Sequence, residues 1–572
     1  MILYPQERIE WFKSNGWWGK ETIYTLFANN AETYWDAPAL VDAPNKPQLV
    51  GLEPLRFTYG ELFQKIDNLA SHLITAGIEK DDIVMVQLPN VTEMVCVYLA
   101  CSRIGAIVSP IAVQYRHHEL NKYIRISEPK AYIGAKDFNK FNYLNMINEI
   151  MPDHPCLKVI IGLGNDLPEN VLSLSDMLNN HSALDTLSDY LTKVDVTSDD
   201  VFTICWTSGT EADPKAVPRS TNEWIGIGSA CHQLCEVKEG YNILNPFPLI
   251  NMSSIGGMWL PWLLSGGGAF VVHHPFDLKV MLGQLQDEKI NYTLIPPAVL
   301  NSLLQNEAIL QSYDISNLKS IGSGSAPLSP WMVKGFQEKY GIFVYNVFGS
   351  TEGIAFVSNF NNPEERALYF PRTGNPLKYG MPNYTWQKPI SLMQETKIVD
   401  PNTKEEITEK GIPGEMCIKG PNVFYGYYKR PDLTGSAFDS EGYFNTGDLF
   451  SIEGEDGNWN KYMFSGRSKD LIIRGGWNIS PEEVENAVLE HPKVAEVAAV
   501  GYPDDRLGEK VCVAVVTKPG ETITLEEINL FLEQKNMAIF KRPERLLTLD
   551  MLPRNPVGKV VKSEIRAMST QH

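Results

Sequence analysis

Residues 201–221 read VFTICWTSGTEADPKAVPRST. The run Val201–Trp206 is apolar and predicts a strand, whereas the segment from Thr221 onward predicts a helix. Between them lie hydroxyl side chains, one glycine and Lys215, whose donors and positive charge suit phosphate oxygens. A plain Ser/Thr turn between a strand and a helix is the alternative interpretation. The stretch is not a Walker A loop, because G-x-x-x-x-G-K-[ST] does not occur in this chain.

Length and charge restrict the class of protein. With 572 residues the chain is expected to form about three or four structural units. A net charge of −19 disfavours binding to nucleic acid or to an anionic membrane surface, so an anionic substrate would need a local positive site. The eight cysteines show no C-x-x-C spacing and predict reduced thiols of an intracellular protein.

No segment predicts export or a membrane span. Met1–Lys20 carries charges throughout, unlike a signal peptide. The most apolar windows, Ile83–Val113 and Ile255–Val272, are interrupted by polar residues, Pro or Gly, so neither supplies about 20 clean apolar residues. We therefore expect a soluble, cytoplasmic protein.

Helices and strands alternate over most of the chain. Helices are predicted at Thr58–Ala76 and Asn90–Ile104, and strands at Asp82–Gln87, Ala106–Ser109, Leu157–Ile161, Val201–Trp206, Gly268–Val272, Tyr292–Ile295 and Leu318–Gly322. This alternation predicts parallel sheets covered on both faces. From about Tyr379 to Tyr462, short strands rich in Gly, Pro and Asn predict a small β-barrel or antiparallel sheet, and a further α/β segment follows Lys469.

Loops with glycine and polar side chains recur along the chain, several of them directly after predicted strands. They are Gly322–Leu328 (GSGSAPL), Tyr345–Gly353 (YNVFGSTEG), Gly442–Leu449 (GYFNTGDL), Gly466–Asp470 (GRSKD), Arg474–Asn478 (RGGWN) and Pro553–Lys559 (PRNPVGK). In open α/β sheets, the loops at the carboxyl ends of strands converge on the ligand crevice. Several loops of this kind are what a nucleotide site requires.

Together and in this order, these motifs resemble those of the adenylate-forming superfamily of acyl-CoA synthetases, luciferases and peptide-synthetase adenylation domains. The likeness runs from about Phe57 to Arg566. It implies an α/β fold with a large N-terminal domain, residues 1–466, made of two α/β sheet subdomains and a small β-barrel at about 379–466. A hinge at 467–470 and a small mobile α+β C-terminal domain, 471–572, follow; a plain exposed loop is the alternative for the charged run at the boundary.

The resemblance implies an ATP site with a defined set of residues. The family's loop for the β- and γ-phosphates is matched by Thr207, Ser208, Gly209, Thr210 and Lys215, and its adenine wall by Gly324, Ser325 and Asn346. Phe348, in the neighbouring family position, either contacts the adenine ring or is a packed core residue.

Acidic and hydroxyl side chains complete the expected nucleotide contacts. Thr351 would hold an α-phosphate oxygen, and Glu352 would bind Mg²⁺, a hard cation suited to one carboxylate plus phosphate oxygens. Asp448 would accept from both ribose hydroxyls, with Arg467 assisting. The alternatives are that Glu352 caps a helix and that Asp448 braces a turn.

The two expected reactions depend on Lys559 and on the hinge. Lys559 matches the lysine of P-x-x-x-x-G-K, which in the family spans the substrate carboxylate and the α-phosphate and stabilises the growing charge. Lys562 is expected to be an ordinary solvated lysine. Formation of acyl-AMP and its attack by a thiol would need two arrangements, so the C-terminal domain would pivot at Lys469. Gly475 and Gly476 would line a tunnel for a pantetheine arm.

The phosphate loop departs from the family pattern [ST]-[ST]-G-[ST]-T-G-x-P-K-G. Glu211, Ala212 and Ala216 replace Thr, Gly and Gly. A carboxylate about 4 Å from a phosphate would cost on the order of 4 kcal/mol at an effective dielectric near 20, so Glu211 must point outward, pair with Lys215 or bind the metal. Ala212 also lacks the backbone freedom of glycine. A catalytically lapsed nucleotide-binding relative is therefore the alternative to an active enzyme.

The acyl pocket is expected near Pro248–Ser254, which reads PLINMSS. Asn251 stands where amino-acid-adenylating domains carry an Asp, and its lack of charge disfavours an amino-acid substrate by about 2 kcal/mol or more. We expect Asn251 and Met252 to line this pocket. Further apolar candidates, some of which would be plain core, are Ile255, Trp259, Ile295, Pro296, Pro297 and Val299.

The sequence therefore predicts an AMP-forming acid–thiol ligase, an acyl-CoA synthetase for a medium-chain or aromatic carboxylic acid. It would use ATP and Mg²⁺, with CoA as co-substrate, and no nucleic acid. The alternative is a stand-alone adenylating enzyme that loads the phosphopantetheine of a separate carrier protein. The identity of the acid and the oligomeric state stay open.

Overall fold

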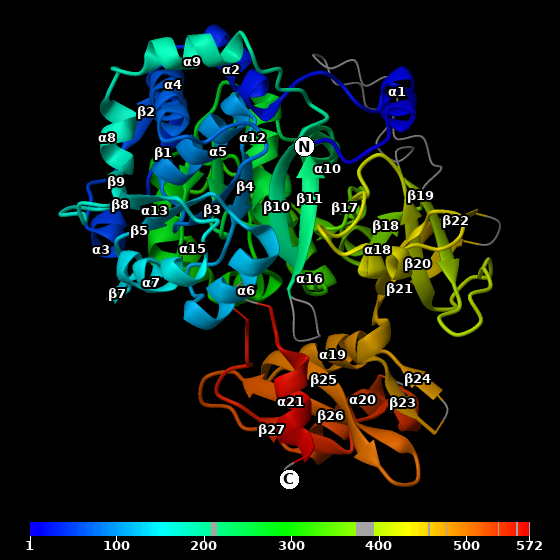
Figure 1. Cartoon of the computed structure of the whole chain (residues 1–572). Helices are drawn as coiled ribbons and strands as arrows, with labels where there is room; N and C mark the ends of the chain where they lie inside the picture. Colours follow the sequence, from blue (N-terminus) through cyan, green and yellow to red (C-terminus); the bar gives the residue numbers. More distant parts are fainter. Residues whose placement is uncertain are drawn as a thin grey trace.

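The computed structural model places the elements from α1 to β22 in a large body and those from β23 to α21 in a smaller carboxyl-terminal body (Figure 1). It describes residues 1–207, 214–372, 394–455, 458–475, 477–535, 537–555 and 559–570. Within these ranges no helix combines the length and apolarity that a membrane span needs.

A first sheet carries the strand that leads to the predicted phosphate loop. Its seven strands run in the order β11 (Lys215–Ser220), β10 (Val201–Thr207), β4 (Ile107–Pro110), β3 (Ile83–Gln87), β5 (Ala131–Ala135), β8 (Val159–Leu163) and β9 (Leu172–Ser173). The pairings from β10 to β9 are parallel, as the alternation of helices and strands predicts.

Strand β11 is not predicted by the sequence, which indicates a loop leading straight into the helix at Thr221. Instead, residues 215–220 pair antiparallel with β10 before that helix begins. Pro218 lacks a backbone N–H, and it is tolerated because β11 is an edge strand of the sheet.

A second, eight-stranded sheet supplies the remaining nucleotide loops. Its order is β17 (Ala355–Ser358), β16 (Phe343–Gly349), β15 (Ser320–Gly324), β14 (Tyr292–Leu294), β12 (Ile243–Asn245), β13 (Phe270–Val272), β1 (Pro38–Val41) and β2 (Arg56–Thr58). The five central pairings are parallel, and the two outermost are antiparallel.

Helices cover both sheets. Those of the large body are α1 (Gln6–Ser14), α2 (Ile23–Thr33), α3 (Lys46–Val50), α4 (Tyr59–Thr75), α5 (Thr92–Ile104), α6 (His117–Ser127), α7 (Tyr143–Ile150), α8 (Leu174–Asn179), α9 (Leu184–Leu191), α10 (Thr221–Leu234), α11 (Met252–Ser254), the π-helix η2 (Ile255–Trp259), α12 (Leu260–Ser265), α13 (Leu278–Asp287), α14 (Pro297–Gln305), α15 (Glu307–Leu310), α16 (Pro330–Tyr340), α17 (Pro363–Leu368) and α18 (Pro431–Ala437). Two short pieces, the 3₁₀-helix η1 (Met151–Asp153) and the hairpin of β6 (Asp137–Phe138) and β7 (Phe141–Asn142), complete this body.

The main apolar core joins the two sheets through α4, α5 and α10. Helix α4 begins with a capping box between Thr58 and Glu61 and buries one face. Helix α5 is buried on nearly all sides, since of its residues Arg103 is the one not fully buried. Apolar residues of β3, β5 and β13 belong to the same cluster.

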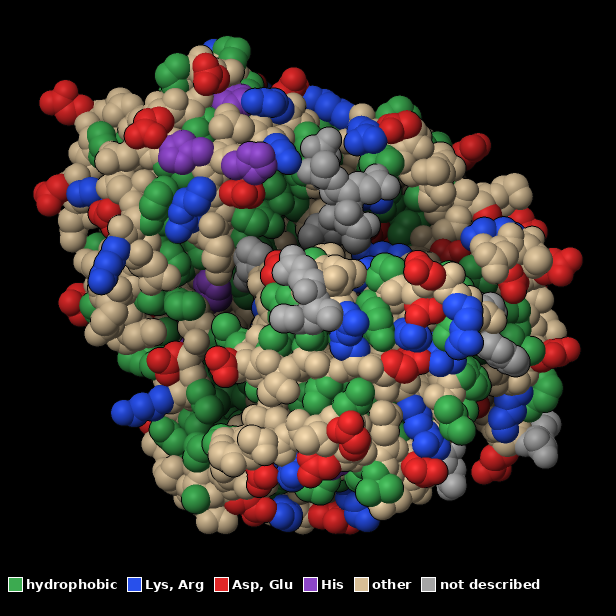
Figure 2. All heavy atoms as spheres, turned by 90° about the horizontal axis from the view of Figure 1, so that it is seen from below, with side chains coloured by type: hydrophobic (Ala, Val, Ile, Leu, Met, Phe, Trp, Pro, Cys, Tyr) green, Lys and Arg blue, Asp and Glu red, His purple; other side chains and the backbone are tan. Residues whose placement is uncertain are grey.

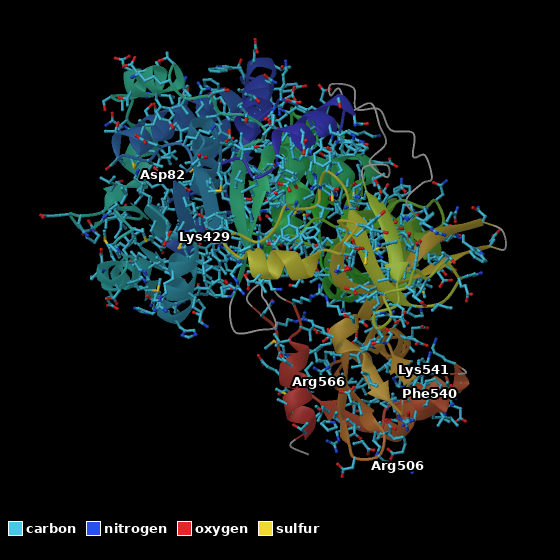
Figure 3. The ribbon with its side chains drawn as sticks, turned by 45° about the vertical axis from the view of Figure 1, so that its right-hand side comes forward. Asp82, Lys429, Arg506, Phe540, Lys541 and Arg566 are labelled. Atoms are coloured by element: carbon cyan, nitrogen blue, oxygen red, sulfur yellow. The ribbon has the colours of Figure 1, made fainter. Side chains whose placement is uncertain are left out.

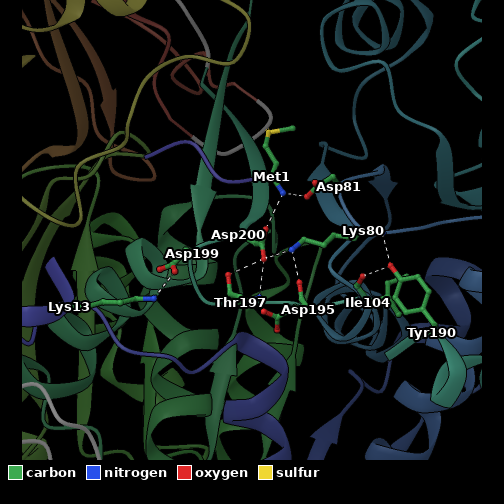
Figure 4. A network of polar contacts seen from close by, with 10 residues as sticks. All are labelled: Met1, Lys13, Lys80, Asp81, Ile104, Tyr190, Asp195, Thr197, Asp199 and Asp200. Carbon is green, nitrogen blue, oxygen red and sulfur yellow. Dashed lines mark hydrogen bonds and ion pairs between the residues drawn. The ribbon is translucent and has the colours of Figure 1, made fainter. Parts of the chain in front are cut away.

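A polar network fixes the start of β10 (Figure 4). Asp200, the residue before β10, accepts from Lys80 Nζ at 2.8 Å and from the Thr197 backbone N–H at 2.9 Å. The Met1 amino group lies 3.1 Å from the other carboxylate oxygen of Asp200, and Met1 O accepts from Val201 N–H at 2.8 Å. The strand that ends at the phosphate loop is thus anchored at its opposite end.

The predicted small β subdomain is an antiparallel sheet. Its strands run in the order β18 (Tyr369–Pro371), β22 (Asn458–Arg467), β21 (Phe444–Glu455), β20 (Gly414–Lys419) and β19 (Glu395–Val399). Phe356, Phe370 and Phe450 form an aromatic core that also joins this sheet to β17.

In the described part of the carboxyl-terminal body, a sheet packs with three helices. The strands are β24 (Trp477–Ile479), β23 (Ile472–Arg474), β26 (Gly508–Thr517), β25 (Val494–Asp504) and β27 (Arg545–Thr548), of which β27 pairs with β26. The helices are α19 (Pro481–Leu489), α20 (Leu525–Gln534) and α21 (Lys562–Thr570), with the 3₁₀ turns η4 (Ser468–Asp470) before β23 and η5 (Ile539–Lys541) after α20. In Figure 3, Asp82 and Lys429 mark the large body, and Arg506, Lys541 and Arg566 mark the smaller one.

The two bodies meet where β22 leads into the smaller one. Gly466 of β22 has φ 113°, and a Cβ there would lie 2.1 Å from Glu482 Oε2 of α19. The backbone conformation therefore favours glycine, and a Cβ would also displace the Glu482 carboxylate. Seen from the side of the smaller body, positive and negative side chains are interspersed over the surface (Figure 2).

Candidate active site

The hairpin of β10 and β11 brings the two ends of the predicted phosphate loop together. Thr207 and Lys215 are cross-strand partners. Lys215 Nζ lies 5.0 Å from the centre of the Tyr427 ring, a cation–π distance. Ser208, Gly209, Thr210, Glu211 and Ala212 lie outside the described residues.

Thr351 and Glu352 occupy the turn between β16 and β17 rather than a helix, so the helix-cap alternative for Glu352 does not apply. Tyr427 Oη donates to Glu352 Oε1 at 3.3 Å, and Phe424 N–H donates to Glu352 O at 2.9 Å. The carboxylate is therefore held against the same tyrosine that faces Lys215.

Asp448 and Arg467 are cross-strand partners on β21 and β22. Arg467 Nε lies 2.9 Å from Asp448 Oδ1, yet among the described residues this oxygen accepts no hydrogen bond. The Asp448 side chain is 2% exposed. Burial raises the pKa of Asp448 to about 6, although Arg467 and Lys559 act in the opposite direction. A buried carboxylate oxygen without a donor is what a ligand hydroxyl would satisfy.

Lys559 lies close enough to Asp448 and Arg467 for their charges to act on it. The lysine side chain reaches solvent, but the surrounding protein desolvates its ammonium group and, with the charge of Arg467, lowers its pKa to about 8. Asp448 and Asp470 oppose this shift. The predicted catalytic lysine and the predicted ribose carboxylate therefore lie near enough for each charge to shift the pKa of the other.

Lys469, in η4, belongs to the same group of charges. Desolvation is the largest cause that lowers its pKa, and the charges of Arg467 and Lys215 contribute in the same direction. Asp470 and Asp448 raise it. Cations from β11, β22, η4 and the Lys559 segment thus converge on one region of an otherwise acidic chain.

The predicted adenine wall lies at the carboxyl ends of β15 and β16. A Cβ at Gly324 would lie 2.0 Å from Val347 O, so only glycine fits this approach, and Ser325 has φ 67°. Asn346 is buried and donates through Nδ2 to Ala367 O at 2.7 Å, which directs its amide nitrogen into the protein.

Phe348 follows the core alternative. Its ring contacts Phe370, Phe450 and Phe464, with centroid distances of 6.0, 5.2 and 4.9 Å. The side chain is partly buried and packs against the aromatic core of the β subdomain.

The acyl-pocket candidates separate into two groups. Asn251 Oδ1 accepts from Ser254 N–H at 3.3 Å and caps α11, and Met252 lies against Gly349, 3.3 Å from the position of a Cβ there. Met252 thereby reaches the strand end that leads to Thr351.

Other apolar candidates are core residues. Ile295 and Val299 pack in the cluster behind the eight-stranded sheet, and Trp259 stacks on Phe202 at a centroid distance of 6.0 Å. The plain-core interpretation therefore holds for Ile295 and Trp259, which are buried, whereas Val299 is partly buried. The π-helix that carries Ile255 and Trp259 directly follows Met252, and π-helical turns are frequent at functional sites.

The proposed hinge and tunnel are only partly described. Lys469 lies in the short η4 turn, between β22 and β23. Gly475, with φ 58°, follows β23 and donates its N–H to Leu507 O at 2.7 Å. Gly476 lies outside the described residues.

Lys562 is not the solvated lysine that the sequence suggests. It is ion-paired with Glu485 at 2.8 Å and Glu482 at 3.3 Å, and its side chain is 17% exposed. Burial alone would lower the pKa of Lys562, but the two carboxylates outweigh it and raise the pKa. The sequence offers no signal for this pairing, because Glu482 and Glu485 lie about 80 residues away on α19.

Sequence reasoning also missed Tyr427, which joins Lys215 to Glu352. It lies in PNVFYGYY, residues 421–428, a stretch without a charged residue or a recognised motif. Its role follows only from the fold, which inserts this segment between β11 and the Thr351–Glu352 turn.

The acidic residues suit a cation held jointly with a ligand. In the described part of the chain no group of three or more His, Cys, Asp or Glu residues could enclose a metal ion. Glu352 supplies one carboxylate near Lys215, and Mg²⁺ is commonly held by one or two carboxylates plus substrate phosphates. The residues therefore fit a magnesium ion that arrives with a nucleotide.

Comparison with known proteins agrees with this site. Residues 27–428 match the AMP-binding enzyme family, and residues 483–559 match the AMP-binding enzyme C-terminal domain. The chain belongs to this family, whose members use ATP and Mg²⁺, and it is an adenylating, AMP-forming ligase.

Similar proteins align over almost their whole length. The chain is 29% identical to the 2-hydroxy-7-methoxy-5-methyl-1-naphthoate–CoA ligase of Streptomyces carzinostaticus, over 99% of this chain and 96% of that protein. It is 28% identical to a salicyl-AMP ligase / salicyl-S-ArCP synthetase of Mycobacterium tuberculosis, over 99% and 94%. The crystal structure of ATP-bound MatB from Rhodopseudomonas palustris superposes with a TM-score of 0.77 at 25% identity, over 96% of this chain and 99% of that one.

Proposed function

We propose that this protein is an acyl-CoA synthetase that activates a medium-chain or aromatic carboxylic acid as acyl-AMP and transfers the acyl group to CoA. The observation that carries the proposal is the convergence of Lys215, Arg467, Lys469 and Lys559 on the carboxylates Asp448 and Glu352. Because the chain has a net charge of −19, this local group of cations is what an anionic substrate requires.

Each side chain has a distinct role in the proposed first reaction. Lys215 binds the β- and γ-phosphates, and Thr351 holds an α-phosphate oxygen. Asp448 accepts from the ribose hydroxyls, which supplies the donor that its buried Oδ1 lacks. Glu352 holds Mg²⁺, which when bound neutralises phosphate charge.

Lys559 is the proposed catalytic cation. It contacts the substrate carboxylate and the α-phosphate while these two anions approach each other, and it stabilises the charge that grows on phosphorus. The carboxylate oxygen forms the new bond to the α-phosphorus, and pyrophosphate leaves. An ammonium group that is partly desolvated by the surrounding protein is effective here, because electrostatic stabilisation grows as the local dielectric falls.

The second reaction needs Lys559 to leave the site so that a thiol can enter. We propose that the C-terminal domain, residues 471–572, pivots at Lys469 in the 467–470 hinge. Gly475 and Gly476 then line the passage of a pantetheine arm. The thiolate attacks the acyl carbonyl carbon, and AMP leaves with the electrons of the broken acyl–oxygen bond. A short helical turn between two strands is suited to absorb such a rotation.

The names of the similar proteins support an aromatic acid as the substrate. They are compatible with either CoA or a carrier protein as the acceptor of the acyl group. One is a naphthoate–CoA ligase, and the other is named both salicyl-AMP ligase and salicyl-S-ArCP synthetase. Loading of a carrier protein is therefore the second candidate for the acceptor step. Asn251, which carries no charge, is consistent with an acid that has no ammonium group.

ATP–pyrophosphate exchange across a panel of benzoates, naphthoates, straight-chain acids and amino acids tests the first reaction. We expect exchange with aromatic or medium-chain acids and none with amino acids. ATP binding without exchange for any acid would favour the catalytically lapsed alternative. Consumption of CoA in the absence of any carrier protein distinguishes the CoA ligase from a carrier-loading enzyme.

A further inference from the structure

Strand β11 carries more than the phosphate-binding lysine. Because side chains alternate along a strand, Lys215, Val217 and Arg219 share one face. Val217 packs with Ile354 and Val423 in the apolar cluster of the β subdomain. This face of β11 is therefore directed at the segment that follows Glu352 and at residues 421–428.

Arg219 is buried at 0% exposure and donates to the backbone of both neighbouring segments. Its Nε donates to Thr351 O at 2.8 Å, and its Nη1 donates to Asn422 O at 2.7 Å. Hydrogen bonds from a charged donor are among the strong ones, and the guanidinium holds its donors in a fixed plane. Arg219 thus fixes the position of Thr351 relative to β11.

A second link joins β11 to the same turn, at the end of the strand that carries Lys215. Lys215 lies over the ring of Tyr427, whose hydroxyl donates to Glu352 Oε1 at 3.3 Å. Glu352 is the next residue after Thr351. The proposed phosphate lysine and the proposed metal carboxylate are therefore joined twice, through Tyr427 and through Arg219.

The position of Arg219 is itself fixed by other buried side chains. Glu223, in the first turn of α10, accepts from the Ser220 N–H at 2.6 Å and lies 3.4 Å from Arg219 Nη1. Tyr4 Oη lies 2.8 Å from Glu223 Oε1 and 2.7 Å from Val423 O. The amino-terminal segment therefore supports the same arrangement.

We propose that Arg219 is a positioning residue that sets Thr351 and Glu352 at the distance from Lys215 at which one Mg²⁺–triphosphate is held by both. The proposal rests on the proposed function, since it concerns the same ATP site. Arg219 touches neither nucleotide nor metal and acts through the backbone of Thr351. It corresponds to the supporting contacts that orient metal ligands, whose loss typically weakens metal binding by about 10–100-fold.

The test is calorimetric titration of the full chain with ATP, once in Mg²⁺ and once in EDTA. The ratio of the two dissociation constants measures how much Mg²⁺ strengthens ATP binding. In Arg219→Met we expect the factor by which Mg²⁺ strengthens ATP binding to fall roughly tenfold. The affinity for ATP measured in EDTA should change much less. Arg219→Lys keeps the charge but loses the planar pair of donors, so it should fall between wild type and Arg219→Met.

Arg366→Met is the matched control. Arg366 is also fully buried and donates to the carbonyls of Val344 and Phe360, at 3.0 and 2.8 Å, but it does not contact the Thr351–Glu352 turn. It should unfold at a lower temperature yet keep the full gain from Mg²⁺. If Arg219→Met does not fold, Arg219→Lys decides the question.

Two results would overturn the inference in distinguishable ways. If the Arg219 variants keep the wild-type gain from Mg²⁺, the positioning role is wrong while the proposed function stands. If wild-type protein shows no strengthening of ATP binding by Mg²⁺, the proposed ATP site fails and the inference fails with it.

Discussion

Two groups of charged side chains in this protein are organised in opposite ways. In the large body, Lys46 Nζ lies 2.6 Å from Asp42 Oδ2 and 2.8 Å from Glu93 Oε1, and all three side chains are at most 3% exposed. Asp42 also accepts from the backbone of Thr92 and Leu55, at 2.8 and 2.9 Å. Every charge in this cluster, which we call the Lys46 cluster, has partners from the protein itself.

The ATP-site group differs in both partners and exposure. The ATP-site group contains four cations, Lys215, Arg467, Lys469 and Lys559. It also contains the buried carboxylate of Asp448, whose Oδ1 has no hydrogen-bond donor among the described residues. Here burial lowers the pKa of Lys559, whereas in the Lys46 cluster Glu93 and Asp42 outweigh burial and raise the pKa of Lys46. Charges whose hydrogen-bond partners all come from the protein, here called matched, indicate a structural role. Asp448 is ion-paired with Arg467, but its Oδ1 accepts no hydrogen bond from the described residues, and such an unmatched group indicates a place for a ligand.

Lys46→Met should have the largest effect on stability. It leaves Asp42 and Glu93 buried without their cation, which typically costs about 3–5 kcal/mol. Urea unfolding should show this loss, while the folded variant should bind ATP with unchanged affinity. A weaker ATP affinity at unchanged stability would mean that the Lys46 cluster is not purely structural.

Lys559→Ala should strongly slow adenylate formation with little effect on stability. Loss of one group that stabilises transition-state charge typically slows a reaction by about 10²–10³-fold. We expect pyrophosphate exchange to fall by that amount, and thiol transfer from supplied acyl-AMP to stay within a few-fold of wild type. Equal loss of both reactions would refute the two-arrangement scheme.

Lys562→Ala is the control for that variant. Because Lys562 is paired with Glu485 and Glu482 inside the smaller body, its removal should lower the unfolding temperature. Loss of stability in Lys562→Ala but not in Lys559→Ala would show the contrast between a matched and an unmatched lysine only three residues apart.

Asp448→Asn should weaken ATP binding without destabilising the protein. The amide presents one acceptor oxygen to the ribose instead of two, and a tenfold weaker affinity corresponds to about 1.4 kcal/mol. Burial raises the pKa of Asp448, so the folded protein already disfavours this charge and its removal should leave the unfolding temperature unchanged or higher. A marked loss of stability would place Asp448 among the structural charges.

The pH dependence of kcat/KM for adenylate formation should show two limbs. Lys559 acts as a cation and has a pKa of about 8, so activity falls as the pH rises above that value. Asp448 acts as a carboxylate and has a pKa of about 6, so activity also falls below pH 6. Lys559→Arg should move the alkaline limb upward, because arginine stays charged. A profile in which that limb does not move would assign it to another group.

Individual strands and residues show how much of the structure could be predicted from the sequence. Strands β3, β4, β8 and β13–β15 lie within two residues of their predicted starts, because their apolar runs are local properties of the chain. Strand β11 was missed, since its short run contains a proline and its pairing depends on β10. The contacts of Phe348, Trp259 and Lys562 depend on packing between distant elements, so residue type alone left their roles open or wrong.

The sequence alone determined which chemical groups are available: the order of six glycine-rich loops, the lysines at positions 215 and 559, and the acids at 352 and 448. These are local patterns, and each is readable without its partners. Only the tertiary structure decided that Lys559 and Asp448 act on each other's charge, that Tyr427 and Arg219 join β11 to the Thr351–Glu352 turn, and that Lys562 is paired. The physical reason is that desolvation and pairing depend on which distant segments enclose a charge.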